Sequence, residues 1–539
     1  MSGLWHTGGR TQLASLLARE WDLLVIGGGI CGAGVLLEAA RRGLKALLVE
    51  QRDFAWGASS RSSKLVHGGL RYLKDGHFAL TRESVREREA LLRDAPGLVE
   101  PQGFAFAHYT GGRGRRSFLA GLALYDLFAK RRERHWLPAE DFLMLAPNVK
   151  RDGLQGGIVY QDAKTDDARL VLRVLREAQS HGAEAVNYLE VRALLRSADG
   201  RVEGARLECG TKGAEHAVRA RVVVDATGAW SGPLHGKGPR LRPLRGSHLV
   251  LPAWRLPLAQ AVSLMHPEDG RPVFAYPWEG ATLVGTTDLD HGESMSTEAR
   301  ITRGEVDYLL AALRAQFPQL GLNVADILAT YAGVRPVVAH GTGTDEARPS
   351  SEGREHTVWS EAGLVAIAGG KLTTFRAIAL DALAEVKRQL PDWDAALDAQ
   401  AIFAPAPVLT DSRAQGKVNA SLLRRLRGRY GADAAALLDA AGTKELDLVP
   451  GTDTAWAELR WAARTEAVRR LDDLLLRRTR LGLLLRGGGA GHMVRIRAIC
   501  QPELGWSDAD WEREEAAYRQ LWTQHYSLPH DEDHYADHA

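Results

Sequence analysis

A glycine-rich turn between two apolar segments is the feature that most limits how this chain can fold. Residues 22–26 (DLLVI) predict a strand that leads into residues 27–32 (GGGICG), which have the spacing GxGxxG. Residues 33–42 predict a helix, and residues 46–49 predict a second strand that ends at Glu50. Strand, turn, helix, strand and acid follow in the order that a dinucleotide-binding βαβ unit requires. The sequence therefore predicts a nucleotide site at this turn.

Each residue type in the turn has a physical role. Gly27 permits the tight turn, Gly29 lets the backbone approach a pyrophosphate, and Gly32 lets the helix pack closely on the strand. The partial positive charge of the helix N-terminus favours phosphate. Glu50 can accept hydrogen bonds from ribose hydroxyls and would repel a phosphorylated ribose, which argues against NADP. By itself this unit fits NAD or FAD.

Two further strand ends favour FAD. Residues 222–224 predict a strand that ends in Asp225-Ala226-Thr227-Gly228, and residues 364–368 predict one that ends in GGKLTT (369–374). Glycines at the carboxyl end of a strand let the chain meet a ligand closely. A polar, basic run (residues 57–73) also follows the second strand of the turn unit. Three such strand ends can line one extended cofactor.

The length of 539 residues predicts two or three domains. We expect an N-terminal extension (1–21), an α/β region (22–395), a linker with two prolines (396–415) and a helical C-terminal region with a polar tail (416–539). Residues 457–473 and 474–485 predict amphipathic helices. Asp162, Asp166 and Asp167 are interpreted as the start of a helix over residues 168–179 rather than as a carboxylate cluster.

Charge and cysteine usage exclude several classes of protein. The net charge of +2 gives no bias toward nucleic acid, and three distant cysteines indicate a reducing, cytoplasmic compartment without a disulfide framework. We expect no metal site, and no apolar run reaches the roughly 20 residues that span a bilayer. Basic clusters are interpreted as solvated helix faces, with attraction to anionic lipid as the alternative, at residues 113–116, 130–134, 424–429 and 477–480.

Eight sequence blocks resemble the FAD-dependent (aerobic, quinone-linked) glycerol-3-phosphate dehydrogenase family, within a larger group similar to D-amino-acid oxidase. They are VIGGGICGAG, SSRSSKLVHGGLRYL, YQDAKTDDARLV, VVDATGAW, RGSHLV, VGTTD, YAGVRP and GGKLTTFR. The resemblance implies a Rossmann-like FAD-binding domain, an α+β substrate domain interleaved with it (about 96–160 and 246–330), and a C-terminal α-helical domain. Cys31 and Ala58 depart from the family pattern, and each departure costs about 0.5–1.5 kcal/mol if it removes a hydrogen bond.

The resemblance also implies a set of site residues. Those along the FAD would be Gly27, Gly29, Gly32, Glu50, Ser59, Ser60, Lys64, Leu65, Gly228, Gly370 and Thr373. His67, Arg335 and Lys371 would act in catalysis, and Arg71, Tyr72 and Arg354 would bind the substrate. Arg335 also fits a structural ion pair, and Tyr72 also fits ordinary packing. We expect Cys31 to be inert.

The implied reaction is the oxidation of sn-glycerol 3-phosphate to dihydroxyacetone phosphate, with hydride transfer from C2 to FAD and electrons passed to a quinone. Arginines suit a phosphate dianion, Lys371 and Arg335 would stabilise a developing alkoxide, and His67 is the candidate proton acceptor. Reaching a quinone would require peripheral association with the inner face of the membrane, and a homodimer is compatible with the sequence. Three alternatives stay open: an oxygen-using glycerol-3-phosphate oxidase, a 2-hydroxy-acid or amino-acid oxidase, and a flavin-binding sensor without turnover.

Overall fold

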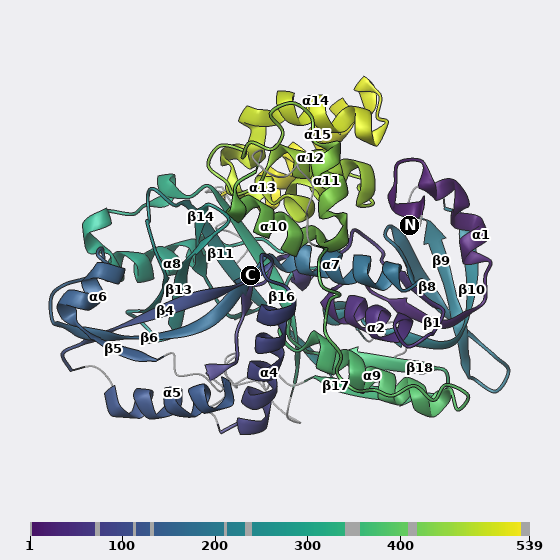
Figure 1. The fold of residues 1–539 in the computed structure, drawn as a ribbon, viewed down its shortest axis with the longest axis horizontal. Helices are drawn as coiled ribbons and strands as arrows, with labels where there is room; N and C mark the ends of the chain where they lie inside the picture. Colours follow the sequence, from purple (N-terminus) through teal and green to yellow (C-terminus); the bar gives the residue numbers. More distant parts are fainter. Residues whose placement is uncertain are drawn as a thin grey trace.

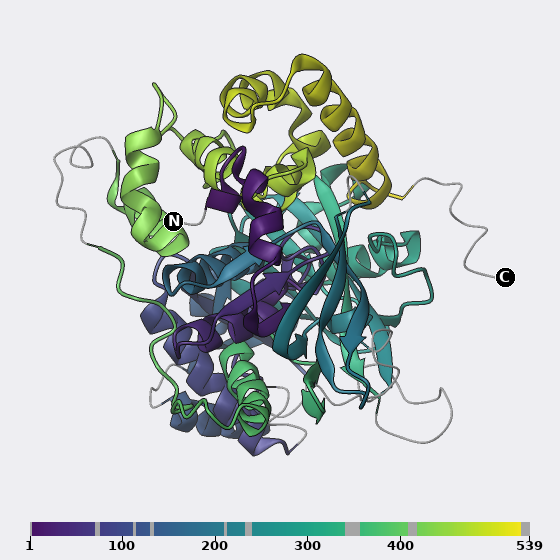
Figure 2. The same cartoon turned by 90° about the vertical axis from the view of Figure 1, so that its right-hand side faces the viewer.

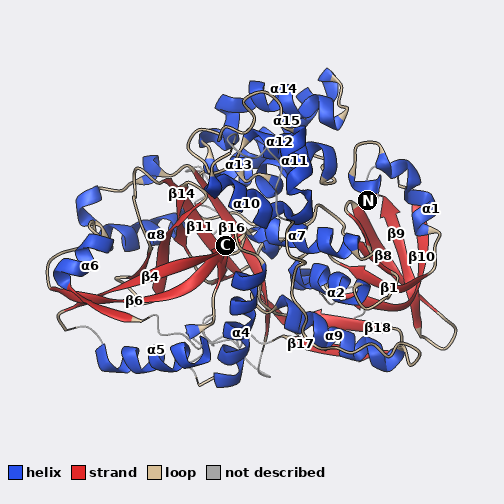
Figure 3. Cartoon of the chain, viewed as in Figure 1, coloured by secondary structure: helices blue, strands red, loops and turns tan. Residues whose placement is uncertain are grey.

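The computed structural model describes residues 3–70, 76–111, 115–129, 134–209, 213–231, 240–339, 356–407 and 418–529. Two β-sheets lie side by side, and the C-terminal helices lie across one end of both (Figure 1). Figure 3 shows strands and helices mixed in both halves of the body and a cap built from helices. This arrangement confirms the predicted α/β fold with a helical C-terminal region.

The first sheet carries the glycine-rich turn. Its strand order is β17-β18-β10-β1-β2-β7, parallel from β18 to β7, with β17 antiparallel at one edge. Leu23, Leu24 and Val25 in β1 are fully buried, as expected for a central strand of a parallel sheet. The strands are β1 (Trp21–Ile26), β2 (Ala46–Val49), β7 (Glu184–Val186), β8 (Leu189–Arg196), β9 (Val202–Cys209), β10 (Glu215–Asp225), β17 (Thr357–Glu361) and β18 (Leu364–Ala368). Helix α2 (Ile30–Ala40) packs between α7 (Asp167–Ser180) and α9 (Phe375–Gln389) beside this sheet.

The second sheet is mostly antiparallel, with the order β15-β11-β14-β13-β12-β4-β6-β3. Strand β16 pairs with β11 along ten residues, and β5 pairs with β6. The strands are β3 (Leu65–Val66), β4 (Val99–Tyr109), β5 (His135–Pro138), β6 (Leu154–Thr165), β11 (Leu241–Pro252), β12 (Ala261–Met265), β13 (Pro272–Trp278), β14 (Ala281–Gly285), β15 (Leu289–Asp290) and β16 (Ala329–Val338). Its helices are α4 (Phe78–Asp94), α5 (Arg115–Ala129), α6 (Ala139–Leu145) and α8 (Arg303–Gln316).

The C-terminal region packs its apolar residues into one core with the second sheet. Its helices are α10 (Ala420–Tyr430), α11 (Ala434–Ala440), α12 (Trp456–Thr465), α13 (Leu481–Leu484), α14 (Met493–Leu504) and α15 (Asp508–His525). The predicted amphipathic helix over 474–485 is wrong: a π-helix, η9 (Asp473–Arg478), and the short α13 occupy this stretch. Leu474, Leu476 and Leu483 are all buried, so this segment has an apolar environment on several sides.

The N-terminal segment lies against these helices, as Figure 2 shows. It contains the short helix α1 (Leu13–Leu17). The Trp5 carbonyl accepts a hydrogen bond from the Ala467 N–H at 3.0 Å, and the Trp5 indole N–H donates to the Ala185 carbonyl at 2.8 Å. One residue therefore joins the C-terminal region to the first sheet.

Four arginines of the predicted basic clusters are buried rather than solvated, so both interpretations of these residues are wrong. They are Arg429, Arg477, Arg478 and Arg480, and each is at most 2% exposed. Their partners are the buried carboxylates Asp53, Asp166 and Asp167. These carboxylates offset the cost of removing the guanidinium groups from water, which a surface interpretation does not anticipate.

Of the three predicted helix-starting acids, two lie where they were expected. Asp166 is the N-cap of α7 and accepts from the Arg169 N–H at 3.2 Å, and Asp167 is the first helical residue. Asp162 lies instead in β6, where it accepts hydrogen bonds from Arg88 and Tyr125 at 2.8 Å each. Asp162 therefore does not belong to the start of α7.

Candidate active site

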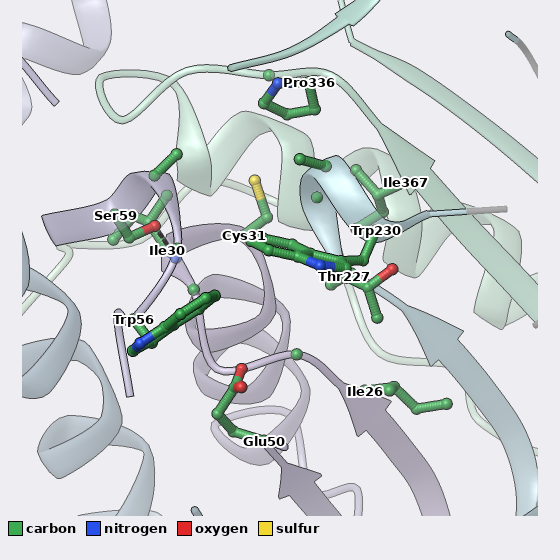
Figure 4. Close-up of a pocket in the computed structure, with 18 of the residues that line it drawn as sticks. Ile26, Ile30, Cys31, Glu50, Trp56, Ser59, Thr227, Trp230, Pro336 and Ile367 are labelled. Carbon is green, nitrogen blue, oxygen red and sulfur yellow. Dashed lines mark hydrogen bonds between the residues drawn. The ribbon is translucent and has the colours of Figure 1, made fainter. Parts of the chain in front are cut away.

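An open cleft of about 330 Å³ lies at the carboxyl ends of β1, β10 and β18. The loop after β2 closes one side of it, and Figure 4 shows Glu50, Trp56, Ser59 and Trp230 arranged around the space. Seven of the predicted site residues line this cleft: Gly27, Gly29, Glu50, Ser59, Gly228, Gly370 and Lys371. The three strand ends singled out in the sequence thus meet at one place.

The backbone geometry of the turn requires glycine at two positions. Gly27 has φ +110°, and a Cβ there would lie 2.6 Å from the Ala226 carbonyl oxygen. A Cβ on Gly32 would lie 2.0 Å from the Gly27 carbonyl oxygen, so α2 packs against the turn with no room for a side chain. The first residues of α2, Ile30 and Cys31, border the cleft, so the positive end of the helix dipole lies there and favours an anion.

The Glu50 carboxylate is held in place by the backbone around it. Its oxygens accept from the Gly28 N–H at 2.7 Å and the Arg52 N–H at 2.8 Å. Burial raises the pKa of Glu50, and these two backbone donors partly oppose that effect. A desolvated carboxylate gains strongly from hydroxyl donors, so the site suits a ribose.

The loop formed by residues 51–61, which we call the cleft loop, supplies a large part of the wall. Gln51, Trp56, Gly57, Ala58 and Ser59 all border the cleft. The Ser59 hydroxyl accepts from the Ile30 N–H in the first turn of α2 at 3.0 Å. The Trp56 ring lies 5.6 Å, centroid to centroid, from the ring of Trp230. Trp230 ends the sequence block VVDATGAW, whereas Trp56 lies in none of the blocks. The contact between the two indoles was not predicted, because it forms only when two different strand ends come together.

The two departures from the family pattern, Cys31 and Ala58, both border the cleft. Burial raises the pKa of the Cys31 thiol to about 12, so this side chain stays a neutral thiol near neutral pH. A neutral thiol is a poor nucleophile, because the reactive species is the thiolate.

The features of the cleft together fit an FAD. They are the glycines at its border, the N-terminus of α2 and a carboxylate that can accept from ribose hydroxyls. Gly27, Gly29, Glu50 and Ser59 are the residues that would hold the cofactor.

Five predicted cofactor residues are not among those that line the cleft. They are Gly32, Ser60, Lys64, Leu65 and Thr373. The Lys64 ammonium is fully buried and donates to the Ser60 carbonyl at 2.9 Å and to Asp167 at 3.0 Å. Burial and the nearby Arg480 lower the pKa of Lys64 to about 8. Its side chain is thus engaged in an ion pair, because α7 brings Asp167 next to it.

The two predicted catalytic cations have different surroundings. Lys371 borders the cleft at the end of β18, between Gly370 and Leu372. Arg335 follows a cleft residue, Val334, in β16, and neighbouring side chains of a strand point to opposite sides. The Arg335 guanidinium donates to Asp288 at 2.9 Å and to the Thr286 hydroxyl at 3.0 Å. Arg335 therefore carries an ion pair within the second sheet.

The remaining predicted residues are placed in part. The His67 carbonyl accepts from the Thr373 hydroxyl at 3.4 Å, which brings the backbone of His67 close to the segment that follows Lys371. Arg71, Tyr72 and Arg354 lie outside the described residues.

His248 is a candidate that the sequence reasoning missed. It lies in β11, is 1% exposed, and stacks on Tyr331 with ring centroids 4.6 Å apart. Its Nε2 is 2.9 Å from the Ser63 hydroxyl, and its Nδ1 has no hydrogen-bond partner among the described residues. Burial, with Arg335 and Lys64 nearby, holds its pKa well below the ordinary value. The block RGSHLV contains this histidine and was the available signal.

Comparison with known proteins places the chain in a family. Residues 22–376 match the family model described as FAD dependent oxidoreductase, and residues 384–511 match the C-terminal domain of alpha-glycerophosphate oxidase. An aerobic glycerol-3-phosphate dehydrogenase of Bacillus subtilis (strain 168) is 41% identical over 68% of this chain and 67% of its own length. One of Staphylococcus aureus (strain USA300) is 34% identical over 85% of this chain and 86% of its own length.

A solved structure extends the likeness to the whole chain. The glycerol-3-phosphate dehydrogenase from Bacillus halodurans complexed with FAD has a TM-score of 0.78 and 27% identity, covering 97% of this chain and 98% of that one. The two family models together span most of the sequence, and the relatives are aligned over two thirds of it or more. The chain therefore belongs to the family of FAD-dependent oxidoreductases that includes the aerobic glycerol-3-phosphate dehydrogenases.

Proposed function

We propose that this protein oxidises sn-glycerol 3-phosphate to dihydroxyacetone phosphate and passes the electrons to a quinone at a membrane surface. The observation that carries the substrate is the alignment of 85% of the chain with a relative named aerobic glycerol-3-phosphate dehydrogenase. The position of Lys371 at the border of the cofactor cleft supports it, because an anionic substrate beside a flavin needs a cation there.

The chemistry divides between cofactor and chain. The bound flavin supplies a hydride acceptor. Lys371 would stabilise negative charge at the C2 oxygen, and Arg335 would contribute from the Asp288 side of β16. His67 and His248 are the two candidates for the proton acceptor. The lowered pKa of His248 keeps its ring neutral at neutral pH. One ring nitrogen of a neutral imidazole can accept a proton.

The substrate is tested by mixing the oxidised holoenzyme with glycerol 3-phosphate under anaerobic conditions and following flavin absorbance. We expect rapid bleaching with glycerol 3-phosphate and none with lactate or D-alanine at the same concentration. Bleaching by lactate or D-alanine alone would assign a different substrate, and no bleaching by any of the three would favour a flavin-binding sensor.

The acceptor is tested by reoxidising the reduced enzyme. We expect a soluble quinone analogue to reoxidise it at least tenfold faster than air-saturated buffer. The C-terminal family model takes its description from an oxidase. Faster reoxidation by oxygen would therefore reverse our assignment of the acceptor and make the protein an oxidase.

Membrane association is proposed through the surface of α4 and α5. Within the described part of the chain, no helix has the length and apolar character needed to cross a bilayer. Phe78 at the start of α4 and Leu127 in α5 are 53% and 69% exposed, on helices that contact each other. In the sequence, basic residues lie at both ends of α5, at 113–116 and 130–134. Apolar side chains with flanking cations suit the surface of an anionic bilayer.

This surface is tested by cosedimentation with vesicles that contain anionic lipid. We expect binding at low salt that weakens as salt is raised, and a loss of at least fivefold in binding for Leu127→Asp. Val494→Asp is the control, because Val494 is 87% exposed on α14 in the C-terminal region. Equal binding by the wild type and Leu127→Asp would refute this surface.

A further inference from the structure

The C-terminal region reaches into the wall of the cofactor cleft. Asp53 lies in the cleft loop, three residues before the cleft-lining Trp56, and its side chain is fully buried. Two consecutive arginines of the π-helix η9 bind it. Arg477 Nε lies 2.5 Å from Asp53 Oδ2, and Arg478 donates to both carboxylate oxygens at 2.6 and 2.7 Å. The cleft loop is thus attached near its start to a segment more than 400 residues further along the chain.

The attachment continues at the far end of the same loop. Arg480 Nη2 donates to the Ser60 carbonyl at 3.2 Å, next to the cleft-lining Ser59. Arg61 donates to the hydroxyl of Tyr526, beyond the end of α15, at 3.1 Å. Four C-terminal side chains therefore contact the loop at Asp53, Ser60 and Arg61, on both sides of the cleft-lining residues 56–59.

The loop conformation itself needs external support. Ala55, between Asp53 and Trp56, has φ +61°, a left-handed conformation that alanine adopts rarely. Its N–H donates to the Gly28 carbonyl at 2.9 Å, so this strained residue ties the loop to the glycine-rich turn. Such backbone conformations persist where surrounding contacts fix them. Asp53, two residues before Ala55, forms a bidentate pair with Arg478. The two parallel hydrogen bonds of this pair fix the orientation of the Asp53 carboxylate.

We propose that Arg477 and Arg478 are positioning residues for the cofactor. By fixing Asp53 they set the conformation of the cleft loop, so FAD binds tightly only when the C-terminal region is packed against this loop. A buried ion pair is weak evidence of stabilisation, since apolar residues of similar volume often serve equally well. A buried ion pair does, however, hold its two side chains in one relative orientation. Here that orientation fixes Asp53, and through it the cleft loop that borders the cofactor cleft. The proposal rests on FAD binding alone and not on the identity of the substrate.

The test compares two lysine variants of buried C-terminal arginines. Arg478→Lys keeps the charge and removes the bidentate contact with Asp53. Arg429→Lys is the matched control, because Arg429 is equally buried and bonds Asp166 at 2.8 Å and Glu279 at 3.5 Å, both outside the cleft loop. Full-length apoprotein of each variant is titrated with FAD, and the thermal midpoint of each apoprotein is measured alongside.

We expect Arg478→Lys to raise the Kd for FAD at least tenfold and Arg429→Lys to raise it less than twofold, although both lower the thermal midpoint. If Arg478→Lys does not fold, Asn187→Ala takes its place. It removes one hydrogen bond from the uncharged Asn187 amide to the Asp53 carboxylate, of 2.9 Å, together with the bond to the Ala467 carbonyl, and leaves both guanidinium groups. We expect a rise in Kd of about threefold for this variant. An FAD affinity unchanged within twofold, or an equal loss in the Arg429→Lys control, would overturn the proposal. No substrate is added, so the outcome is independent of the reaction proposed above.

Discussion

Lys371 is the predicted catalytic residue that the fold places most directly. It follows two glycines at the carboxyl end of β18 and borders the cleft, and we propose that its charge meets the anionic substrate there. We expect Lys371→Met to lower kcat/KM about 100-fold, the loss typical of removing one charge-stabilising group, or about 2.7 kcal/mol. Steady-state kinetics with glycerol 3-phosphate gives the ratio, and the flavin spectrum of the purified variant should still show bound FAD.

The exposed Lys150 supplies the control for this variant. Lys150→Met should keep kcat/KM within twofold of the wild type. Our assignment of Lys371 fails if Lys371→Met is equally active.

His248 links the candidate site to acid stability. Burial first, then Arg335 and Lys64, hold its pKa well below 6.5 in the folded state. The unfolded chain therefore binds more protons here than the folded one at acidic pH. The stability that the neutral ring contributes is fully present above about pH 6.5 and is lost as the pH falls toward the folded-state pKa.

We therefore expect the free energy of unfolding to fall between pH 7 and pH 5, and His248→Asn to fall less steeply than the wild type. Denaturant unfolding at four pH values measures both slopes. The same replacement at the exposed His181 is the control and should leave the slope unchanged. Parallel slopes for wild type and His248→Asn would contradict this account.

At the scale of elements, the unit β1–turn–α2–β2 shows what the sequence can predict. Strand β2 has the predicted bounds, and β1 begins one residue earlier than predicted. Much of this unit is defined locally: the φ of +110° at Gly27 favours glycine, and Gly32 is limited by the Gly27 carbonyl oxygen five residues before it. The same holds for β18, whose predicted range of 364–368 is the observed one.

This local logic gives a sharp prediction for Gly32. A methyl group there would lie 2.0 Å from the Gly27 carbonyl oxygen, a backbone atom that cannot move without displacing the turn. We expect Gly32→Ala to destabilise the protein by about 1–3 kcal/mol and to be purified largely without FAD. Thermal unfolding and the ratio of flavin to protein absorbance measure the two effects. Gly292→Ala, which adds a methyl group into open space, should match the wild type in both.

The C-terminal elements show where sequence reasoning stops. The arginines at 477, 478 and 480 have the local pattern of a solvated basic cluster. Apart from the local pairs of Arg477 with Asp472 and Asp473, they bind carboxylates 313 to 425 residues away. No local pattern encodes such pairs. The same applies to His248 and to the Trp56–Trp230 contact, which arise only when distant strand ends come together. The cofactor cleft was predictable from its strand ends, whereas its supports from the C-terminal region were not.

At the scale of the whole molecule, buried charge pairs join the C-terminal region to the first sheet and should make the two unfold together. Arg169 of α7 binds Glu466 at the end of α12 through two hydrogen bonds, and both side chains are almost fully buried. Glu466→Gln leaves the buried guanidinium without its counter-charge. We expect this change to cost about 3–5 kcal/mol of unfolding free energy. Calorimetry should show one transition for the wild type and a lower, broadened or divided transition for Glu466→Gln.

The paired replacement Arg169→Met with Glu466→Leu separates the cost of the unpaired charge from the worth of the pair. It removes both charges and keeps the volume apolar, so we expect most of the lost stability to return. Asp392→Asn, which breaks the exposed pair with Arg221, should leave the transition close to that of the wild type, because solvent already screens both groups. If the double variant were as unstable as Glu466→Gln, the loss would come from the contacts of Arg169 with the Arg478 carbonyl and the Tyr430 ring instead. The single transition would then depend on packing around Arg169 rather than on charge, and the two regions would be joined by a different physical force than the one we infer.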